Sequence, residues 1–272
     1  MKFILILIAF LLSSHAWANP PFTIPRSQVL HIDDPDTERR YSVAIKLPKN
    51  YEKNPQRHYP VIVLADAPYT FQITSGATRY PMNSGAMDHA ILVGLGYEIG
   101  SVGSSSRIRD YTPSVAADWK RETGGAARYA AFLEHRLLPT LGKQFRIQPQ
   151  GHTLAGHSLG GLFATYVLFH KPELFDNYII SSPSVWFKNE EALTWETVEY
   201  KTSKRVFLSV GEYERPAFGE GQDMVDGVES LAKKLAPVDS VSLRVEILAE
   251  AKHHTSFPTS IIQGLDWLYG AK

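Results

Sequence analysis

The chain has 272 residues, 44% hydrophobic and 21% charged, which is enough for one sizeable hydrophobic core. Lys plus Arg equals Asp plus Glu at 28 each, so the chain lacks the excess positive charge expected of a nucleic-acid-binding protein. It contains no cysteine, which excludes disulfide bonds and a lipid anchor on cysteine.

The first 18 residues predict a secretory signal peptide. Lys2 is followed by a ten-residue apolar run over residues 3–12, and Ala16-Trp17-Ala18 has the small residues of a cleavage site. The apolar run is too short to span a membrane, and an uncleaved anchor is the alternative. Cleavage after Ala18 leaves 27 basic and 28 acidic residues in a chain that begins at Asn19. We therefore expect a periplasmic or secreted protein.

The remaining chain, residues 19–272, is expected to form a single α/β domain. Apolar runs and period-two alternation predict strands over residues 28–32, 40–47, 59–65, 90–96, 153–155, 177–181, 205–210 and 241–248. Helical spacing predicts helices over residues 126–145, 161–169, 224–235 and 258–269, with a kink at Pro139. Residues 70–87 are weakly helical at best, and residues 97–125 form a long Gly- and Ser-rich loop, which is usually functional. Alternating strands and helices indicate a mostly parallel sheet with helices on both faces.

The pattern Gly156-His157-Ser158-Leu159-Gly160 lies between a predicted strand and a predicted helix. It matches G-x-S-x-G, the nucleophile elbow of α/β-hydrolases, where glycines permit a tight strand-to-helix turn. The pattern also occurs by chance, and the alternative is a Gly-rich turn that carries a solvated serine. We predict that Ser158 is a catalytic nucleophile.

An elbow serine needs an acid and then a histidine later in the chain. Glu212 and Glu214 follow the predicted strand that ends at residue 210, and either can be the acid. His253 and His254 follow the strand that ends at residue 248, and either can be the base that takes the serine proton. His157 adjoins the nucleophile, but we expect its side chain to leave the turn in another direction.

An oxyanion hole requires backbone N–H donors beside the nucleophile. Leu159, directly after the serine, supplies one. The second is expected from the loop after residue 65, where Pro68 has no N–H and Ala67 or Tyr69 must serve. No metal is expected, because the histidine pair is adjacent rather than spaced by four and no H-E-x-x-H motif occurs. No dinucleotide or P-loop motif predicts a cofactor either.

Several blocks together resemble one family. They are Arg107–Pro113, Gly124–Ala126, Gly156–Leu162 and Ser181–Trp186, within a likeness that covers residues 40–269. They resemble the esterase D group of α/β-hydrolases, and within it the periplasmic siderophore trilactone esterases of the IroE type. The resemblance implies an α/β-hydrolase fold and a serine esterase with Ser158 as nucleophile.

The resemblance also implies roles for the acid and the base. The family base precedes a small residue, Ser, a hydrophobic residue and Pro, which favours His254 ahead of residues 255–258. The family acid lies three residues after the Gly that ends its strand, which favours Glu214, although some trilactone esterases look like Ser–His dyads. Asp66-Ala67 replaces the Asp-Gly common after the third strand, which leaves the second oxyanion donor open.

Family likeness places Arg107 near the pocket mouth, where it could meet an anionic ligand; the alternative is an Arg107–Asp110 pair that braces the loop. Trp186 is expected to be a pocket wall or a core residue. The expected function is hydrolysis of small-molecule carboxylic esters through an acyl-serine intermediate, with enterobactin- or salmochelin-like trilactones as candidates. The alternatives are acetyl, feruloyl or other small esters, acyl transfer, and a non-catalytic binding module. The oligomeric state is not predicted.

Overall fold

The computed structural model describes residues 22–102 and 104–271. The predicted signal peptide, residues 1–18, and its cleavage site lie outside these residues. Within the described part of the chain, every helix is too short or too polar to cross a membrane.

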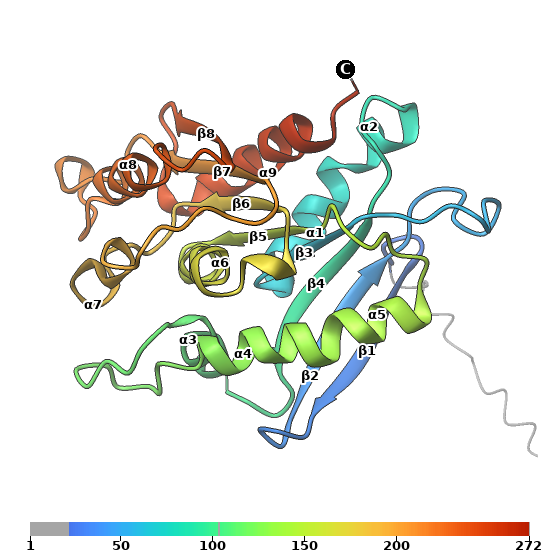
Figure 1. Ribbon diagram of the computed structural model, residues 1–272, viewed down its shortest axis with the longest axis horizontal. Coiled ribbons are helices and arrows are strands. Elements are labelled where there is room, and N and C mark those ends of the chain that lie inside the picture. The colour runs from blue at the N-terminus through green and yellow to red at the C-terminus, as the bar shows by residue number, and fades with distance from the viewer. Residues whose placement is uncertain (1–21, 103, 272) are drawn as a thin grey trace, which may run out of the picture.

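One eight-stranded sheet organises the molecule, in the order β1-β2-β4-β3-β5-β6-β7-β8 (Figure 1). The strands are β1 (Ser27–Asp34), β2 (Arg39–Lys46), β3 (Val61–Leu64), β4 (Ile91–Glu98), β5 (Thr153–His157), β6 (Asn177–Ser181), β7 (Lys204–Gly211) and β8 (Val241–Leu248). β1 and β2 are antiparallel to their neighbours, and β4, β3, β5, β6, β7 and β8 run parallel. The predicted mostly parallel sheet is confirmed.

Helices cover both faces of the sheet, because the side chains of its central strands alternate between two apolar clusters. In β3, Val61 and Val63 belong to one cluster and Ile62 and Leu64 to the other. The first cluster is covered by α3 (Ser105–Tyr111), α4 (Ala126–Phe132), α5 (Leu138–Gln144), α6 (Leu159–His170) and α8 (Met224–Leu235). The second is covered by α1 (Ala67–Ala77), α2 (Arg79–Ser84) and α9 (His253–Tyr269). The short helix α7 (Phe187–Glu190) lies between β6 and β7 in the chain.

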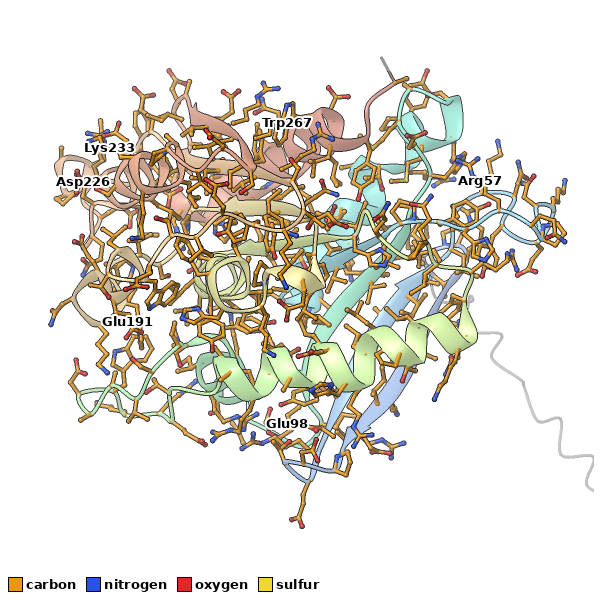
Figure 2. The ribbon with its side chains drawn as sticks, viewed as in Figure 1. Arg57, Glu98, Glu191, Asp226, Lys233 and Trp267 are labelled. Carbon is orange, nitrogen blue, oxygen red and sulfur yellow. The ribbon has the colours of Figure 1, made fainter. Side chains whose placement is uncertain are left out.

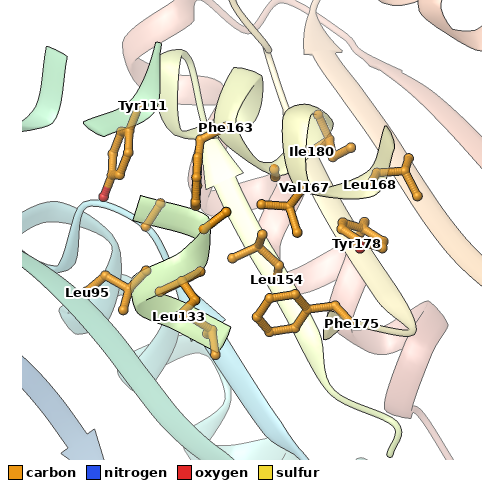
Figure 3. Close-up of a cluster of buried hydrophobic side chains, with 14 of the residues drawn as sticks. Leu95, Tyr111, Leu133, Leu154, Phe163, Val167, Leu168, Phe175, Tyr178 and Ile180 are labelled. Carbon is orange, nitrogen blue, oxygen red and sulfur yellow. The ribbon is translucent and has the colours of Figure 1, made fainter. Parts of the chain in front are cut away.

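The first cluster anchors the elbow helix. Phe163 and Val167 of α6 pack with Leu154 of β5 and Ile180 of β6, all fully buried (Figure 3). Complete burial of such a side chain stabilises a fold by about 1.5–3 kcal/mol. The elbow between β5 and α6 is therefore held from both sides by core packing.

Residues 70–87 contain more helix than predicted. They include most of α1 and all of α2. The helical pattern of α1 is hard to detect because its buried positions include Thr70 and Thr74, whose hydroxyls donate to the carbonyls of Ala65 and Thr70 at 2.6 and 2.8 Å. Polar residues that bond to the backbone can occupy a core position, and this weakens the apolar periodicity.

Where a kink was predicted at Pro139, the helix has a wider turn just before this residue. Between α4 and α5, residues Leu133–Leu137 form a π-helical turn. Proline has no N–H to bond the carbonyl four residues earlier, so the regular α-helical hydrogen-bond pattern is interrupted at this point.

Candidate active site

The chain turns sharply between β5 and α6, and Ser158 lies at the turn. Its φ of 59° and ψ of −121° are unfavourable for a residue with a Cβ atom, and α6 begins at the next residue. A Cβ atom on Gly156 would collide with the carbonyl of Gly160, so this position requires glycine. The structure therefore has the strand–turn–helix geometry of a nucleophile elbow.

The carboxyl ends of neighbouring parallel strands bring the other functional groups to the same edge. Ser158 follows β5, Ser182 follows β6, and Glu214 comes three residues after the end of β7. α9 begins at His253, five residues after β8 ends. Residues that are far apart in the sequence thus meet beside the elbow.

Glu214 is fully buried and lies within a hydrogen-bond network. Its Oε1 accepts from Ser182 Oγ at 2.7 Å and from the N–H of Gly211 at 2.8 Å, and its Oε2 lies 2.6 Å from His253 Nδ1. Burial by itself raises the pKa of a carboxyl, but the bonds from His253, Ser182 and Gly211 outweigh it and lower the pKa of Glu214 below its ordinary value. The alternative acid, Glu212, is exposed, and its Oε2 accepts from the N–H of Glu250 at 2.9 Å.

The structure separates the two candidate histidines. His253, not the predicted His254, contacts Glu214 and lines the hollow that contains Ser158. The two histidines begin α9, where successive side chains point about 100° apart, and His254 is directed into solvent. Because Nδ1 of His253 faces the carboxylate, Nε2 is the nitrogen left for other partners.

His157 lies directly beside this histidine. The ring centroids of His157 and His253 are 4.6 Å apart, and His157 Nδ1 lies 3.1 Å from Ser181 Oγ. Burial, and then the neighbouring His253, lower the pKa of His157 to about 3. The imidazole of His157 is therefore neutral at pH 7 and adds no charge next to His253.

The two predicted alternatives for the second oxyanion donor differ in what their N–H groups bond. The N–H of Leu159, the first predicted donor, has no acceptor within its own helix because α6 begins at this residue. The N–H of Tyr69 donates to the carbonyl of Asp66 at 2.9 Å and is already used. The N–H of Ala67, the first residue of α1, therefore remains as the candidate for the second oxyanion donor. The ring of Tyr69 instead packs 5.5 Å from that of Phe257.

Asp66 fixes the loop that carries Ala67. It adopts a left-handed conformation with φ of 59°, which Asp tolerates better than most residues. Arg107 binds both of its carboxylate oxygens, at 2.7 and 2.9 Å, and Tyr97 Oη donates to Oδ1 at 2.8 Å. Arg107 thus pairs with Asp66 rather than with Asp110, and it does not line the hollow at Ser158. The partner of Asp110 is Arg109.

A hollow of about 180 Å³ opens at Ser158. Trp186 forms one wall of this hollow, and its ring stacks on that of Trp119 with centroids 6.2 Å apart and planes 18° apart. The lining residues are Ser158, Ser184, Trp186, Glu220, Gly221, Gln222, Met224 and His253. The volume is below that of pockets that enclose a drug-sized ligand, so only a small part of a large substrate can enter it.

Sequence reasoning missed two serines at the site. Ser182 orients Glu214, and Ser184 Oγ lies 3.4 Å from Ser158 Oγ. Both lie in the block Ser181–Trp186 that carries the family resemblance, which was the available signal. Five residues after this block, Glu191, labelled in Figure 2, accepts from Ser114 Oγ at 2.6 Å and ties the chain to the loop before α4.

Comparisons with known proteins identify the family of this chain. The model of the Esterase family, described as "Putative esterase", matches residues 35–258. Ferri-bacillibactin esterase BesA from Bacillus subtilis is 32% identical over 245 residues, which cover 83% of this chain and 82% of that protein.

Solved structures share the fold. The BES protein from Bacillus cereus superimposes with a TM-score of 0.80 at 30% identity, over 93% of this chain and 98% of that one. An IroE-like serine hydrolase from Shewanella oneidensis gives a TM-score of 0.76 at 23% identity, over 89% of this chain and 80% of that one. The expected α/β-hydrolase fold and esterase family are confirmed: the chain belongs to the Esterase family and is a carboxylic ester hydrolase.

Proposed function

We propose that the protein cleaves esters through an acyl-enzyme on Ser158, with His253 as the general base and Glu214 as the acid that orients it. The observation that carries the proposal is the 2.6 Å contact between Glu214 Oε2 and His253 Nδ1, beside the hollow that His253 shares with Ser158. Because Nδ1 faces the carboxylate, Nε2 is the imidazole nitrogen available to take the serine proton.

The proposed reaction has two halves. His253 Nε2 takes the Ser158 proton as Oγ attacks the ester carbonyl, and it returns the proton to the leaving alkoxide as the C–O bond breaks. In the second half His253 takes a proton from water as the water attacks the acyl carbonyl, and it returns the proton to Ser158 Oγ as the acyl C–O bond breaks and the acid leaves. The N–H groups of Leu159 and Ala67 are proposed to stabilise the oxyanion in both halves.

We propose ester bonds of a siderophore, an iron-chelating small molecule, as the substrate class. Two observations support this choice. The relative that is 32% identical is named a ferri-bacillibactin esterase. The hollow at Ser158 is small and bordered by Trp186, whose ring stacks on Trp119, which suits an ester presented by a large aromatic ligand that stays mostly outside.

The experiment compares ferri-bacillibactin, apo-bacillibactin and enterobactin as substrates, with products separated by chromatography. We expect linear fragments with the wild type and none with Ser158→Ala. Labelling of Ser158 by a fluorophosphonate tests the acyl-serine step separately. Labelling without trilactone cleavage would refute the substrate class, and absence of labelling would refute the nucleophile.

We also propose that the protein is exported and that residues 1–18 are removed. The apolar run of residues 3–12 and the Ala16–Ala18 site support this. Mass spectrometry of the protein from its native host should give a chain that begins at Asn19. A chain that retains residues 1–18 would refute cleavage.

A further inference from the structure

A second hollow lies at the end of the sheet opposite the elbow. Lys46, the last residue of β2, pairs with Leu92 near the start of β4. Leu92 pairs in turn with Ile62 of β3, and Ile62 pairs with Thr153, the first residue of β5. Ser158, in contrast, follows the last residue of β5. The hollow is also lined by the C-terminal part of α1, whereas the N-terminus of this 11-residue helix lies beside Asp66, about 16 Å away along the helix axis.

Three cations converge on this hollow, which has a volume of about 300 Å³. Lys46 is 7% exposed, and Arg26 and Arg79 lie on the surface around it. The apolar part of the wall comes from Phe22, Ile24 and Pro25, and the polar remainder from Gln72, Ser75 and Gly76.

The cations have no carboxylate partner in the structure. Among residues 22–102 and 104–271, no ion pair includes Lys46, Arg26 or Arg79, and the lining residues contain no Asp or Glu. Residues 1–21 contain no acidic side chain that could supply one. Burial, followed by repulsion from Arg26 and Arg79, lowers the pKa of Lys46 to about 8. A buried charge is normally paired, so the arrangement is unfavourable without an anion.

The end of α1 explains only part of this cluster. Lys46 Nζ donates to the carbonyl of Ser75 at 2.8 Å, which is a favourable contact for a cation at a helix C-terminus. An ammonium group has three protons, however, and the helix end carries only about half a negative charge. Two N–H donors of Lys46 and the full positive charges of Arg26 and Arg79 are not balanced by the helix end.

We propose that this hollow binds a phosphate or carboxylate group carried on a small apolar body. The anion would contact Lys46 Nζ and the two guanidinium groups, and the apolar body would pack on Phe22, Ile24 and Pro25. The volume of the hollow, about 300 Å³, is at the lower limit of pockets that hold small molecules. The site is separate from the ester hydrolase site and does not depend on the role of Ser158.

The probe is phenyl phosphate, titrated by calorimetry against the full protein, with phenol as the uncharged comparison. We expect phenyl phosphate to bind with a millimolar or lower Kd and phenol to bind at least tenfold more weakly. Lys46→Met should weaken phenyl phosphate at least tenfold, and Arg79→Gln about fivefold, because each removes one charge from the hollow. Lys233→Met is the matched control, since Lys233 is exposed on α8 (Figure 2), and it should leave the Kd unchanged.

Three results would overturn the proposal. They are equal binding of phenol and phenyl phosphate, an unchanged Kd in Lys46→Met, and competition between phenyl phosphate and p-nitrophenyl acetate, which would put the anion at the elbow. If Lys46→Met does not fold, the double variant Arg26→Gln/Arg79→Gln decides, because both side chains are exposed. Unchanged affinity in that variant would overturn the proposal as well.

Discussion

Replacement of Glu214 by Gln tests whether the buried carboxylate orients His253. The amide has the same shape, and its oxygen can still accept from Ser182 Oγ and the Gly211 N–H. Its NH₂ group would then face His253 Nδ1, where the carboxylate oxygen now lies at 2.6 Å. Two donors cannot bond each other, so the imidazole must place its proton on Nε2, and Nε2 can then no longer accept the proton of Ser158.

The corresponding amide substitution in serine proteases lowers kcat about 10⁴-fold. We therefore expect Glu214→Gln to lower kcat about 10³- to 10⁴-fold, or about 4–5.5 kcal/mol in the activation barrier. The assay is hydrolysis of p-nitrophenyl acetate at pH 8, with circular dichroism to verify folding. Glu212→Gln is the matched control and should stay within twofold, because Glu212 is exposed and bonds only a backbone N–H. A loss below tenfold in Glu214→Gln would refute the role of the acid and favour a Ser–His dyad.

Three further predictions follow from the same geometry. His253→Ala should lower kcat at least 10³-fold and His254→Ala less than threefold, because only His253 contacts the acid; the reverse ranking in the ester assay would contradict the geometry. The pKa of His157, about 3, lies below its ordinary value, so its contribution to stability is complete above about pH 6.5 and is lost as the pH falls toward 3. In urea unfolding, this group should make the free energy of unfolding about 2 kcal/mol lower at pH 5 than at pH 7. His157→Gln should remove this pH dependence. An equal pH dependence of the unfolding free energy in the variant would argue against a buried neutral ring. Gly156→Ala should destabilise the fold by more than 3 kcal/mol because its Cβ collides with the backbone, whereas Gly142→Ala, which meets only a side-chain methyl at 3.7 Å, should stabilise helix α5 by about 0.5–1 kcal/mol. Similar thermal melts for the two variants would count against the collision.

The fold was largely predictable because its strands are buried and its amphipathic helices are regular. The predicted bounds of β6, β8 and α8 agree with the structure. In α8 the buried positions Val225, Val228 and Leu231 recur at helical spacing, whereas Asp226 lies on the outer side (Figure 2). α1 was less predictable because buried threonines that bond to the backbone replace apolar residues on its inner face.

The site was predictable in type and less so in detail. The elbow pattern and the order of acid and histidine identified the three strand ends that meet. The choice between His253 and His254 depends on where α9 begins, because one residue rotates a helical side chain by about 100°. Pro258 suggested a start close to itself, but the helix begins at His253 and accommodates the proline in its second turn. The missing N–H of Pro258 leaves the carbonyl of His254 available, and Tyr69 Oη approaches it at 3.5 Å.

The pairing of Arg107 with Asp66 was not predictable because the two residues are 41 positions apart and belong to different elements. The sequence offered Asp110 as a nearby partner, but Asp110 lies on the same helix as Arg109 and is bound by it. Local charge patterns identify candidate partners, whereas the fold decides which of them meet.

The backbone at Ser158 has a consequence for directed evolution. Its φ of 59° and ψ of −121° suit glycine better than serine, so the proposed nucleophile occupies a position where glycine would make the fold more stable. A library of variants selected only for thermal stability should therefore enrich Ser158→Gly, and one selected for ester cleavage should exclude it. Position 158 would then separate the two selection pressures within a single sequencing experiment.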